Sequence, residues 1–183
     1  TVSGIPNNGS IAVLDYVALT SLPTRTGYTF RGWSTTANGN VEYEANDSAV
    51  IDNVDAATTN HLYAVWQINS YDYTVEYYID GTKDDNLTET DSAPFDTVIN
   101  SYPDKCPTGY KFEKHENIPL TIGTDESANV IKVYYVKDTF KLTINYVFTD
   151  GTTAHNSHTE SLAVDATYDV PSPTINGYTA DRT

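Results

Sequence analysis

The stretch Pro107-Thr108-Gly109-Tyr110-Lys111-Phe112 holds a proline, a glycine and an aromatic residue in an arrangement that occurs three times in the chain. The other copies are residues 23–30, which contain Gly27-Tyr28, and residues 173–178, which end in Gly177-Tyr178. Proline and glycine favour a turn, and the aromatic residue after the glycine favours the start of a strand. Each copy therefore predicts a turn and then a strand, and their recurrence predicts a repeat protein.

A second element precedes two of these turns. Residues 73–79 and residues 142–148 alternate apolar and polar side chains, and each stretch then reaches an Asp-Gly pair. This pattern predicts a strand that ends in a tight turn, with Tyr77 in one copy and Tyr146 in the other. The Asp-Gly glycine lies 28 residues before the Gly-Tyr glycine in one copy and 26 in the other. Two landmarks in nearly the same register support the repeat more strongly than either alone.

A closing strand is predicted at residues 61–66, which contain Tyr63 and Trp66, and at residues 131–136, which contain Tyr134. A third closing strand does not follow the last Gly-Tyr pair. We therefore predict three units, of which the last is truncated at its C-terminal end. Their predicted bounds are residues 1–68, 69–138 and 139–183.

The charge of the chain excludes several classes of partner. The chain has 183 residues and a formal net charge of −15, which divides among the three predicted units as −4, −8 and −3. Nucleic acids and anionic membrane surfaces need clustered cations, and the ten lysines and arginines are spread along the chain. No apolar run approaches the roughly 20 residues of a membrane-spanning helix. We predict no nucleic-acid partner and no membrane insertion of this segment.

The composition nevertheless predicts a folded, strand-rich protein. Hydrophobic residues make up 39% of the chain and aromatic residues 12%, including 15 tyrosines. The joints at residues 67–70 and 137–139 are short and lack glycine and proline, so we expect a stiff, extended rod. We also expect the chain to be a monomer. The chain has no initiator methionine and no signal-like start, from which we expect a fragment of a longer or processed precursor.

The first unit resembles the Listeria–Bacteroides repeat, the B-repeat module of internalin-type surface proteins. The resemblance rests on two motifs: Gly27-Tyr28-Thr29-Phe30-Arg31-Gly32-Trp33 and the closing Leu62-Tyr63-Ala64-Val65-Trp66. It covers about residues 1–67. The family usually opens with one more strand, which we expect to be missing just before Thr1.

The second and third units resemble MucBP repeats, the mucin-binding-protein modules of Gram-positive surface proteins. The resemblance rests on the two opening strands, on the Gly-Tyr pairs and, in the second unit, on Val133-Tyr134-Tyr135. Both resemblances imply a mainly β fold of small α+β, β-grasp (ubiquitin-like) repeats, which have few strands and a short or vestigial helix. Residues 46–56 are the candidate for this helical crossover in the first unit. The residues expected to carry the structural motifs are Gly27, Tyr28, Phe30, Gly32, Trp33, Tyr63, Trp66, Tyr77, Gly109, Tyr110, Tyr134, Tyr146, Gly177 and Tyr178.

These resemblances imply an extracellular location on a Gram-positive cell surface, with wall attachment in the full-length protein. Three hypotheses of function arise from them. The segment is the stalk or an adhesion module of a surface adhesin. Alternatively, it binds host mucin glycans or a host protein such as immunoglobulin. A third hypothesis makes it an accessory region of a large secreted enzyme.

Catalytic residues are not indicated by the sequence. His155 and His158 are the only neighbouring histidines, and two ligands do not make a zinc site. Their hydrophilic stretch, residues 153–158, predicts a loop. No nucleophile-elbow motif is present, so we predict a non-enzymatic chain without a catalytic residue or cofactor.

Two sets of residues remain as binding candidates. Trp33 and Trp66 are the aromatic residues that could stack on a sugar, although their positions on motif strands favour a role in the core. Calcium is the metal for which the sequence offers candidate ligands, because hard cations bind clustered oxygen ligands. Its candidate ligands, which we weigh against solvated turn carboxylates, are Asp80, Asp84, Asp85, Asp125 and Glu126.

Overall fold

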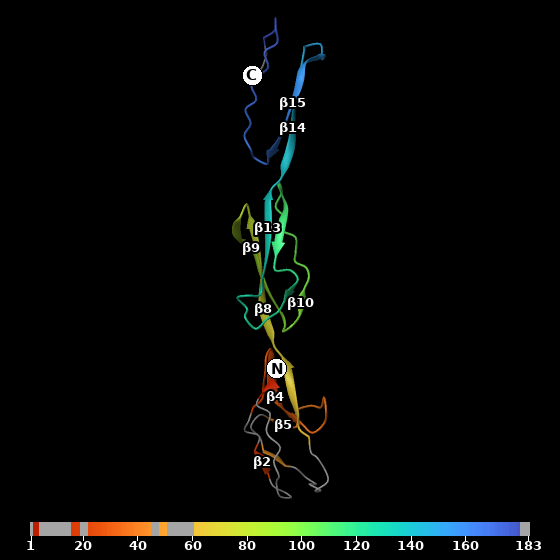
Figure 1. Ribbon diagram of the computed structural model, residues 1–183, viewed down its shortest axis with the longest axis vertical. Helices are drawn as coiled ribbons and strands as arrows, with labels where there is room; N and C mark the ends of the chain where they lie inside the picture. Colours follow the sequence, from red (N-terminus) through yellow and green to blue (C-terminus); the bar gives the residue numbers. More distant parts are fainter. Residues whose placement is uncertain (1, 4–15, 19–21, 45–47, 51–60, 180–183) are drawn as a thin grey trace. The chain divides into compact units, whose positions relative to one another are not determined.

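The computed structural model describes residues 2–3, 16–18, 22–44, 48–50 and 61–179, and their regular elements are all β-strands (Figure 1). The predicted mainly β class is confirmed. None of these residues forms a helix with the length and apolarity needed to cross a bilayer. The strands are β1 (Val2–Ser3), β2 (Tyr16–Ala18), β3 (Thr24–Arg25), β4 (Tyr28–Ser34), β5 (Tyr43–Glu44), β6 (Ser48–Val50), β7 (Tyr63–Ile68), β8 (Ser70–Ile79), β9 (Thr82–Pro94), β10 (Val98–Ile99), β11 (Tyr110–Glu116), β12 (Leu120–Thr121), β13 (Val130–Lys137), β14 (Thr139–Val147) and β15 (Thr153–Ala163).

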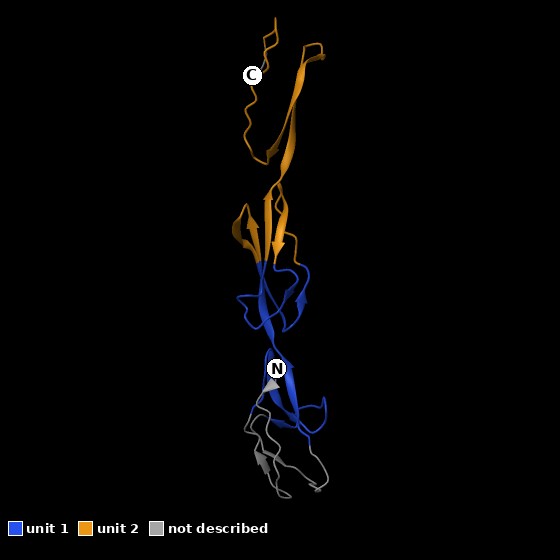
Figure 2. Cartoon of the chain, in the orientation of Figure 1, with its two compact units in different colours: residues 1–75, 89–101, 117–131 blue, residues 76–88, 102–116, 132–183 orange. Residues whose placement is uncertain are grey.

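The chain forms two compact units, coloured separately in Figure 2. Unit 1 consists of residues 1–75, 89–101 and 117–131, and unit 2 consists of residues 76–88, 102–116 and 132–183. The division crosses β8, β9 and β13, so these units are defined differently from the sequence repeats. The repeat bounds stay a prediction.

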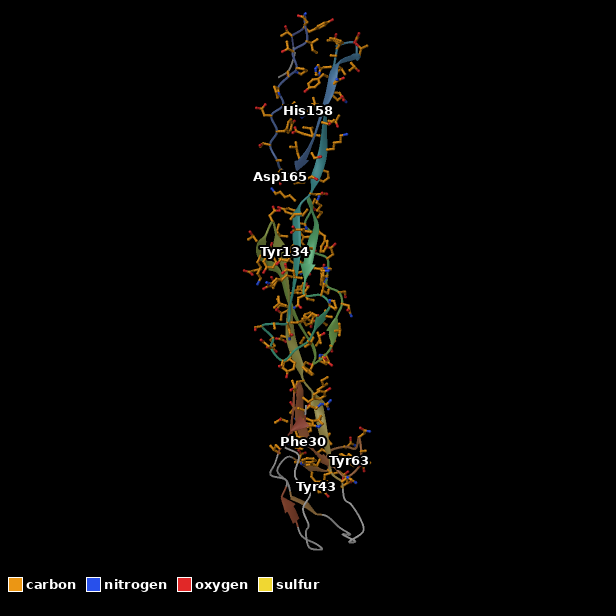
Figure 3. All side chains as sticks on the ribbon, in the orientation of Figure 1. Phe30, Tyr43, Tyr63, Tyr134, His158 and Asp165 are labelled. Atoms are coloured by element: carbon orange, nitrogen blue, oxygen red, sulfur yellow. The ribbon has the colours of Figure 1, made fainter. Side chains whose placement is uncertain are left out.

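The first sheet of unit 1 brings together the two motifs of the first repeat. Its strand order is β1-β3-β4-β5, and β7 pairs with the other edge of β4. The β4–β7 register runs from Tyr28 opposite Ile68 to Ser34 opposite Tyr63, with an irregularity between Phe30 and Gly32. Trp33 is only 2% exposed and forms the core with the partly buried Phe30, Tyr43, Leu62 and Ala64. Figure 3 labels Phe30 and Tyr43 of this cluster.

Part of the predicted crossover at residues 46–56 is wrong. Ser48–Val50 is strand β6, which pairs antiparallel with β2. The remaining residues of that prediction lie outside the described part of the chain. Short strands of this kind carry little periodicity from which the sequence could distinguish them from a helix.

The second sheet has the strand order β11-β13-β8-β9. Successive side chains on a strand point to opposite faces. One face is therefore buried, and in unit 2 it carries Tyr77, Val133 and Tyr135, all at most 1% exposed. The phenol of Tyr77 donates to the carbonyl of Pro103 at 2.6 Å, so its polar end is satisfied. Ring planes of Tyr77 and Tyr135 are parallel to within 1°.

Strands β14 and β15 form a two-stranded antiparallel sheet in unit 2. Its register pairs Thr139 with Ala163 and Leu142 with Glu160. The predicted loop at residues 153–158 is wrong, because these residues begin β15. Backbone pairing with β14 holds this polar segment in the strand, and a two-stranded sheet leaves polar side chains in contact with water.

The three Gly-Tyr pairs do not all lead into a strand. Tyr28 begins β4 and Tyr110 begins β11, as predicted. Tyr178 is 65% exposed and lies outside any strand, so the predicted strand does not begin there. The physical difference is pairing: β4 and β11 each have an antiparallel neighbour, β7 and β13 respectively.

Candidate functional site

The exposed face of the second sheet carries a stacked pair of tyrosines. Tyr78 on β8 and Tyr134 on β13 point away from the buried Tyr77 and Tyr135, because neighbouring residues of a strand alternate. Their ring centroids are 4.7 Å apart and their planes differ by 21°. Both side chains are half-buried, and Figure 3 labels Tyr134 on its strand. The two stacked rings form an aromatic platform on this face of the sheet.

Each tyrosine of this platform donates a hydrogen bond to a glutamate. Tyr78 Oη donates to Glu76 Oε2 at 2.9 Å, and Tyr134 Oη donates to Glu116 Oε2 at 3.2 Å. The bond to Glu76 is the main cause that raises the pKa of Tyr78. Burial, followed by the bond to Glu116, raises the pKa of Tyr134. Both phenols therefore remain neutral donors at physiological pH.

Three lysines complete the surface. Lys83 lies 2.8 Å from Glu76, and Lys114 lies 2.7 Å from Glu116. Their hydrogen bonds are the main cause that lowers the pKa of each glutamate. Lys114 also lies over the ring of Tyr134 at 4.5 Å, and Lys132 lies 6.0 Å from the ring centre of Tyr78. We call Glu76, Tyr78, Lys83, Lys114, Glu116, Lys132 and Tyr134 the tyrosine platform.

The tyrosine platform offers π-faces, carboxylate acceptors and ammonium donors within one sheet face. This combination can stack against the apolar face of a sugar ring while polar groups bind its hydroxyls. Of its residues, only Tyr134 is among the motif residues expected from the sequence. A signal for the others was available, because Glu76 with Tyr78, Lys114 with Glu116 and Lys132 with Tyr134 are pairs at positions i and i+2.

A hollow in unit 1 is the second candidate surface. It has a volume of about 460 Å³ and is lined by Pro23, Thr24, Arg25, Thr26, Tyr28, Phe30 and Trp66. Sites for small ligands commonly measure about 300–1,000 Å³. The guanidinium of Arg25 lies 3.7 Å from the centre of the Tyr28 ring. Of the two tryptophans proposed from the sequence, Trp66 lines this hollow, whereas Trp33 lies in the core.

The carboxylates proposed as calcium ligands all have partners in the protein. Asp125 Oδ1 accepts from the backbone and hydroxyl of Ser127, the main cause that lowers its pKa. The other contacts are Asp80 with Lys137 N, Asp84 with Asn86 N, Asp85 with Lys83 Nζ, and Glu126 with Asp72 N. Within the described ranges, no group of three His, Cys, Asp or Glu side chains is arranged to hold a metal ion. The preferred interpretation of these residues as solvated turn carboxylates, and calcium binding as its alternative, both stay predictions.

The remaining motif residues occupy the strands and turns on which the repeats depend. Gly27, Gly109 and Gly177 have φ angles of +76°, +85° and +82°. Tyr63 lies on β7, and Tyr146 lies on β14. None of these residues joins the tyrosine platform.

Comparison with known families matches two parts of the chain. Residues 5–65 match the Listeria-Bacteroides repeat domain, and residues 141–183 match the MucBP domain. These are the repeat types predicted for the first and third units. For residues 69–138 the MucBP resemblance stays a prediction. No curated protein matches the chain.

Proposed function

We propose that this chain, with its Listeria-Bacteroides repeat and its MucBP domain, is a non-catalytic repeat segment of a bacterial cell-surface adhesin. Both domains are typical of extracellular surface proteins. In this proposal the segment acts as a monomeric stalk that carries adhesive surface, and the full-length protein is attached to the cell wall.

The observation that carries the stalk is the single residue at each joint. Strand β7 ends at Ile68 and β8 begins at Ser70, while β13 ends at Lys137 and β14 begins at Thr139. Only Asn69 and Asp138 therefore separate consecutive strands, and no flexible linker fits into such a joint. The negative charge of every predicted repeat adds mutual repulsion, which favours an extended and soluble array.

Small-angle X-ray scattering of the chain tests the stalk. We expect an elongated particle whose largest dimension is unchanged at high salt. One-residue joints with backbone hydrogen bonds restrict bending even when ions screen the charges of the chain. A compact globule would contradict the stalk. Elongation that disappears at high salt would assign the extension to charge repulsion instead of the joints.

Binding of mucin glycans is the second candidate function, and the tyrosine platform favours it. The test measures binding of the chain to immobilised mucin and to a glycan array. We expect Tyr78→Ala with Tyr134→Ala to weaken binding about tenfold, a loss of about 1.4 kcal/mol, because the substitutions remove both rings on which a sugar would pack. Tyr168→Ala is the matched control, because Tyr168 is 59% exposed and lies outside the platform.

The hollow at Trp66 provides the alternative location for a glycan. Trp66→Ala and Arg25→Ala weaken mucin binding if the hollow is the site and leave it unchanged if the platform is the site. A pull-down with immunoglobulin tests the alternative that the ligand is a host protein. Absence of binding in all three assays would contradict the binding function and leave the stalk alone.

A further inference from the structure

At the joint between the first and second repeats, backbone hydrogen bonds and an aromatic ring surround Gly27. The carbonyl of Gly27 accepts from the amide of Asn69 at 2.9 Å, and the carbonyl of Asn69 accepts from the amide of Phe95 at 2.8 Å. The ring of Phe95 covers Gly27 and occupies the place where a Cβ atom would be. Tyr28 and Tyr71 place their rings edge-on to Phe95, with centroids 6.3 and 6.4 Å away. All of these residues belong to unit 1.

The joint between the second and third repeats has the same bonds. The carbonyl of Gly109 accepts from the amide of Asp138 at 2.8 Å, and the carbonyl of Asp138 accepts from the amide of Val164 at 3.0 Å. A Cβ atom on Gly109 would lie 3.0 Å from Cγ1 of Val164. These residues all belong to unit 2.

The two arrangements correspond residue by residue. Asn69 directly precedes β8 and Phe95 directly follows β9, whereas Asp138 precedes β14 and Val164 follows β15. In both cases the covering residue lies 26 positions after the joint residue. The glycine is thus covered by the base of the next repeat's hairpin, although the covering side chain is aromatic in one joint and β-branched in the other.

We propose that the glycine of each Gly-Tyr pair is a docking seat for the hairpin base of the following repeat. The seat combines a backbone acceptor with an absent Cβ, and its occupant supplies an Asn or Asp at the joint and an apolar residue 26 positions later. The positive φ explains a preference for glycine. It does not explain the covering side chain, because Gly81 and Gly151 have φ angles of +78° and +85° with no atom near their Cβ positions.

Gly177 is assigned the same role toward a further repeat of this kind. Its φ of +82° matches those of the occupied seats, and Tyr178 N donates to Ile175 O at 3.1 Å as Tyr110 N donates to Pro107 O at 3.1 Å. Among the described residues, no atom lies within 4 Å of its Cβ position. The turn therefore has the conformation of a seat and the space for an occupant.

Matched glycine substitutions distinguish two effects of adding a Cβ atom: the clash with the covering side chain and the backbone cost of a positive φ. Gly109→Ala and Gly151→Ala impose the same φ penalty, since both glycines have a φ of +85°. We expect Gly109→Ala to speed hydrogen exchange of the Asp138 and Val164 amides about tenfold more than Gly151→Ala does, because local opening governs exchange of such amides. Gly27→Ala and Gly81→Ala form the second matched pair, and their effects are measured as hydrogen exchange of the Asn69 and Phe95 amides. Equal effects within both pairs would overturn the proposal.

Truncating the covering side chain provides an independent test, which can be carried out even if the glycine variants fold poorly. Val164→Ala deletes the Cγ atoms that face Gly109, so it is expected to speed exchange of the same two amides by itself. In the double variant, Gly109→Ala should add at most about twofold to that rate, because directly contacting residues are not additive. Additive effects would show that glycine and valine act separately and would overturn the seat.

The assignment of Gly177 is tested by the same measurement. In the present chain, Gly177→Ala should behave like Gly151→Ala. In a chain that continues with a further repeat, it should speed exchange at the new joint as Gly109→Ala does at Asp138. No effect there would restrict the seat to the two glycines that are covered in this structure.

Discussion

The hairpins β8–β9 and β14–β15 have related sequences and differ in burial. Tyr77 on β8 is fully buried, and its counterpart Tyr146 on β14 is half-buried. Tyr78 is half-buried, and its counterpart Val147 is 58% exposed. The alternation is the same in both strands, so each residue faces the expected side, but the extent of burial is not shared.

The difference lies in the third strand. Strand β8 has β13 as a neighbour, which supplies Val133 and Tyr135 to the buried face, while β14 pairs with β15 in a two-stranded sheet. A two-stranded sheet cannot bury one face by itself. A strand's sequence therefore sets its faces, whereas the closing strand of the repeat creates the core.

Truncating the two matched tyrosines should give the largest difference. Tyr77→Ala should lower the free energy of unfolding of the second sheet by about 3–5 kcal/mol, because it removes a large buried ring and the hydrogen bond to Pro103. Tyr146→Ala should cost about 1 kcal/mol or less, because its ring is half in water. Chemical denaturation followed by amide exchange of β13 and β14 measures both. Equal losses would show that β14 is packed as tightly as β8.

A pair of asparagines extends the comparison to polar groups. Asn129 is buried, donates to the carbonyls of Asp72 and Gly123, and accepts from the amide of Gly123. Asn129→Ala should therefore cost about 2–3 kcal/mol, because it leaves buried backbone groups without partners. Asn145 on β14 accepts from Ser157 in an exposed position, so Asn145→Ala should cost less than about 0.5 kcal/mol. The same denaturation series measures the difference, and a cost below about 1 kcal/mol for Asn129→Ala would mean that water replaces its bonds.

Much of the local structure can be predicted from the sequence. The Gly-Tyr turns at Gly27 and Gly109 and the strands after them were predicted, because turn formation and period-two alternation are local properties. Residues 153–158 show where such reasoning fails. Their hydrophilic composition favoured a loop, and pairing with β14 determined a strand. Residues that form a strand through a partner carry little of that information themselves.

The candidate surfaces cannot be located without knowing which strands are neighbours. The sequence places Tyr78 on one face of β8 and Tyr134 on one face of β13, but only the strand order brings the rings together. The covering of Gly27 by Phe95 is similar, because the two residues are joined through Asn69 and the whole β8–β9 hairpin. Register between distant strands depends on packing and cannot be read from one strand alone.

Alkaline pH should destabilise the second sheet, to which β13 contributes Tyr135. Burial, followed by the hydrogen bond to Asp104, raises the pKa of Tyr135 above its ordinary value near 10. The unfolded chain ionises first, so the contribution of Tyr135 is complete below about pH 10 and is lost as the pH rises toward its folded pKa. The second sheet should therefore lose stability above about pH 10. Tyr135→Phe should remove that pH dependence and lower stability at pH 7 by about 1 kcal/mol, measured by denaturation between pH 7 and 11.

An unchanged alkaline slope in Tyr135→Phe would assign the pH dependence to other tyrosines. Tyr134→Phe is the matched control, since Tyr134 lies on the same strand but on the exposed face. Its phenol is bound to Glu116 at 3.2 Å, a longer bond than the 2.6 Å between Tyr135 and Asp104. The control should therefore alter the slope less than Tyr135→Phe does.

The smallest difference is expected on the exposed faces. Tyr78→Ala removes the stack on Tyr134 and should cost about 0.5–1.5 kcal/mol, the range measured for aromatic pairs. Val147→Ala, at the corresponding position of β14, should cost less than about 0.5 kcal/mol, because its side chain is mostly in water. Both values come from denaturation at neutral pH. If Tyr78→Ala is as mild as Val147→Ala while mucin binding falls, the tyrosine platform serves binding and not stability, because a stack that stabilises the sheet cannot be removed without loss.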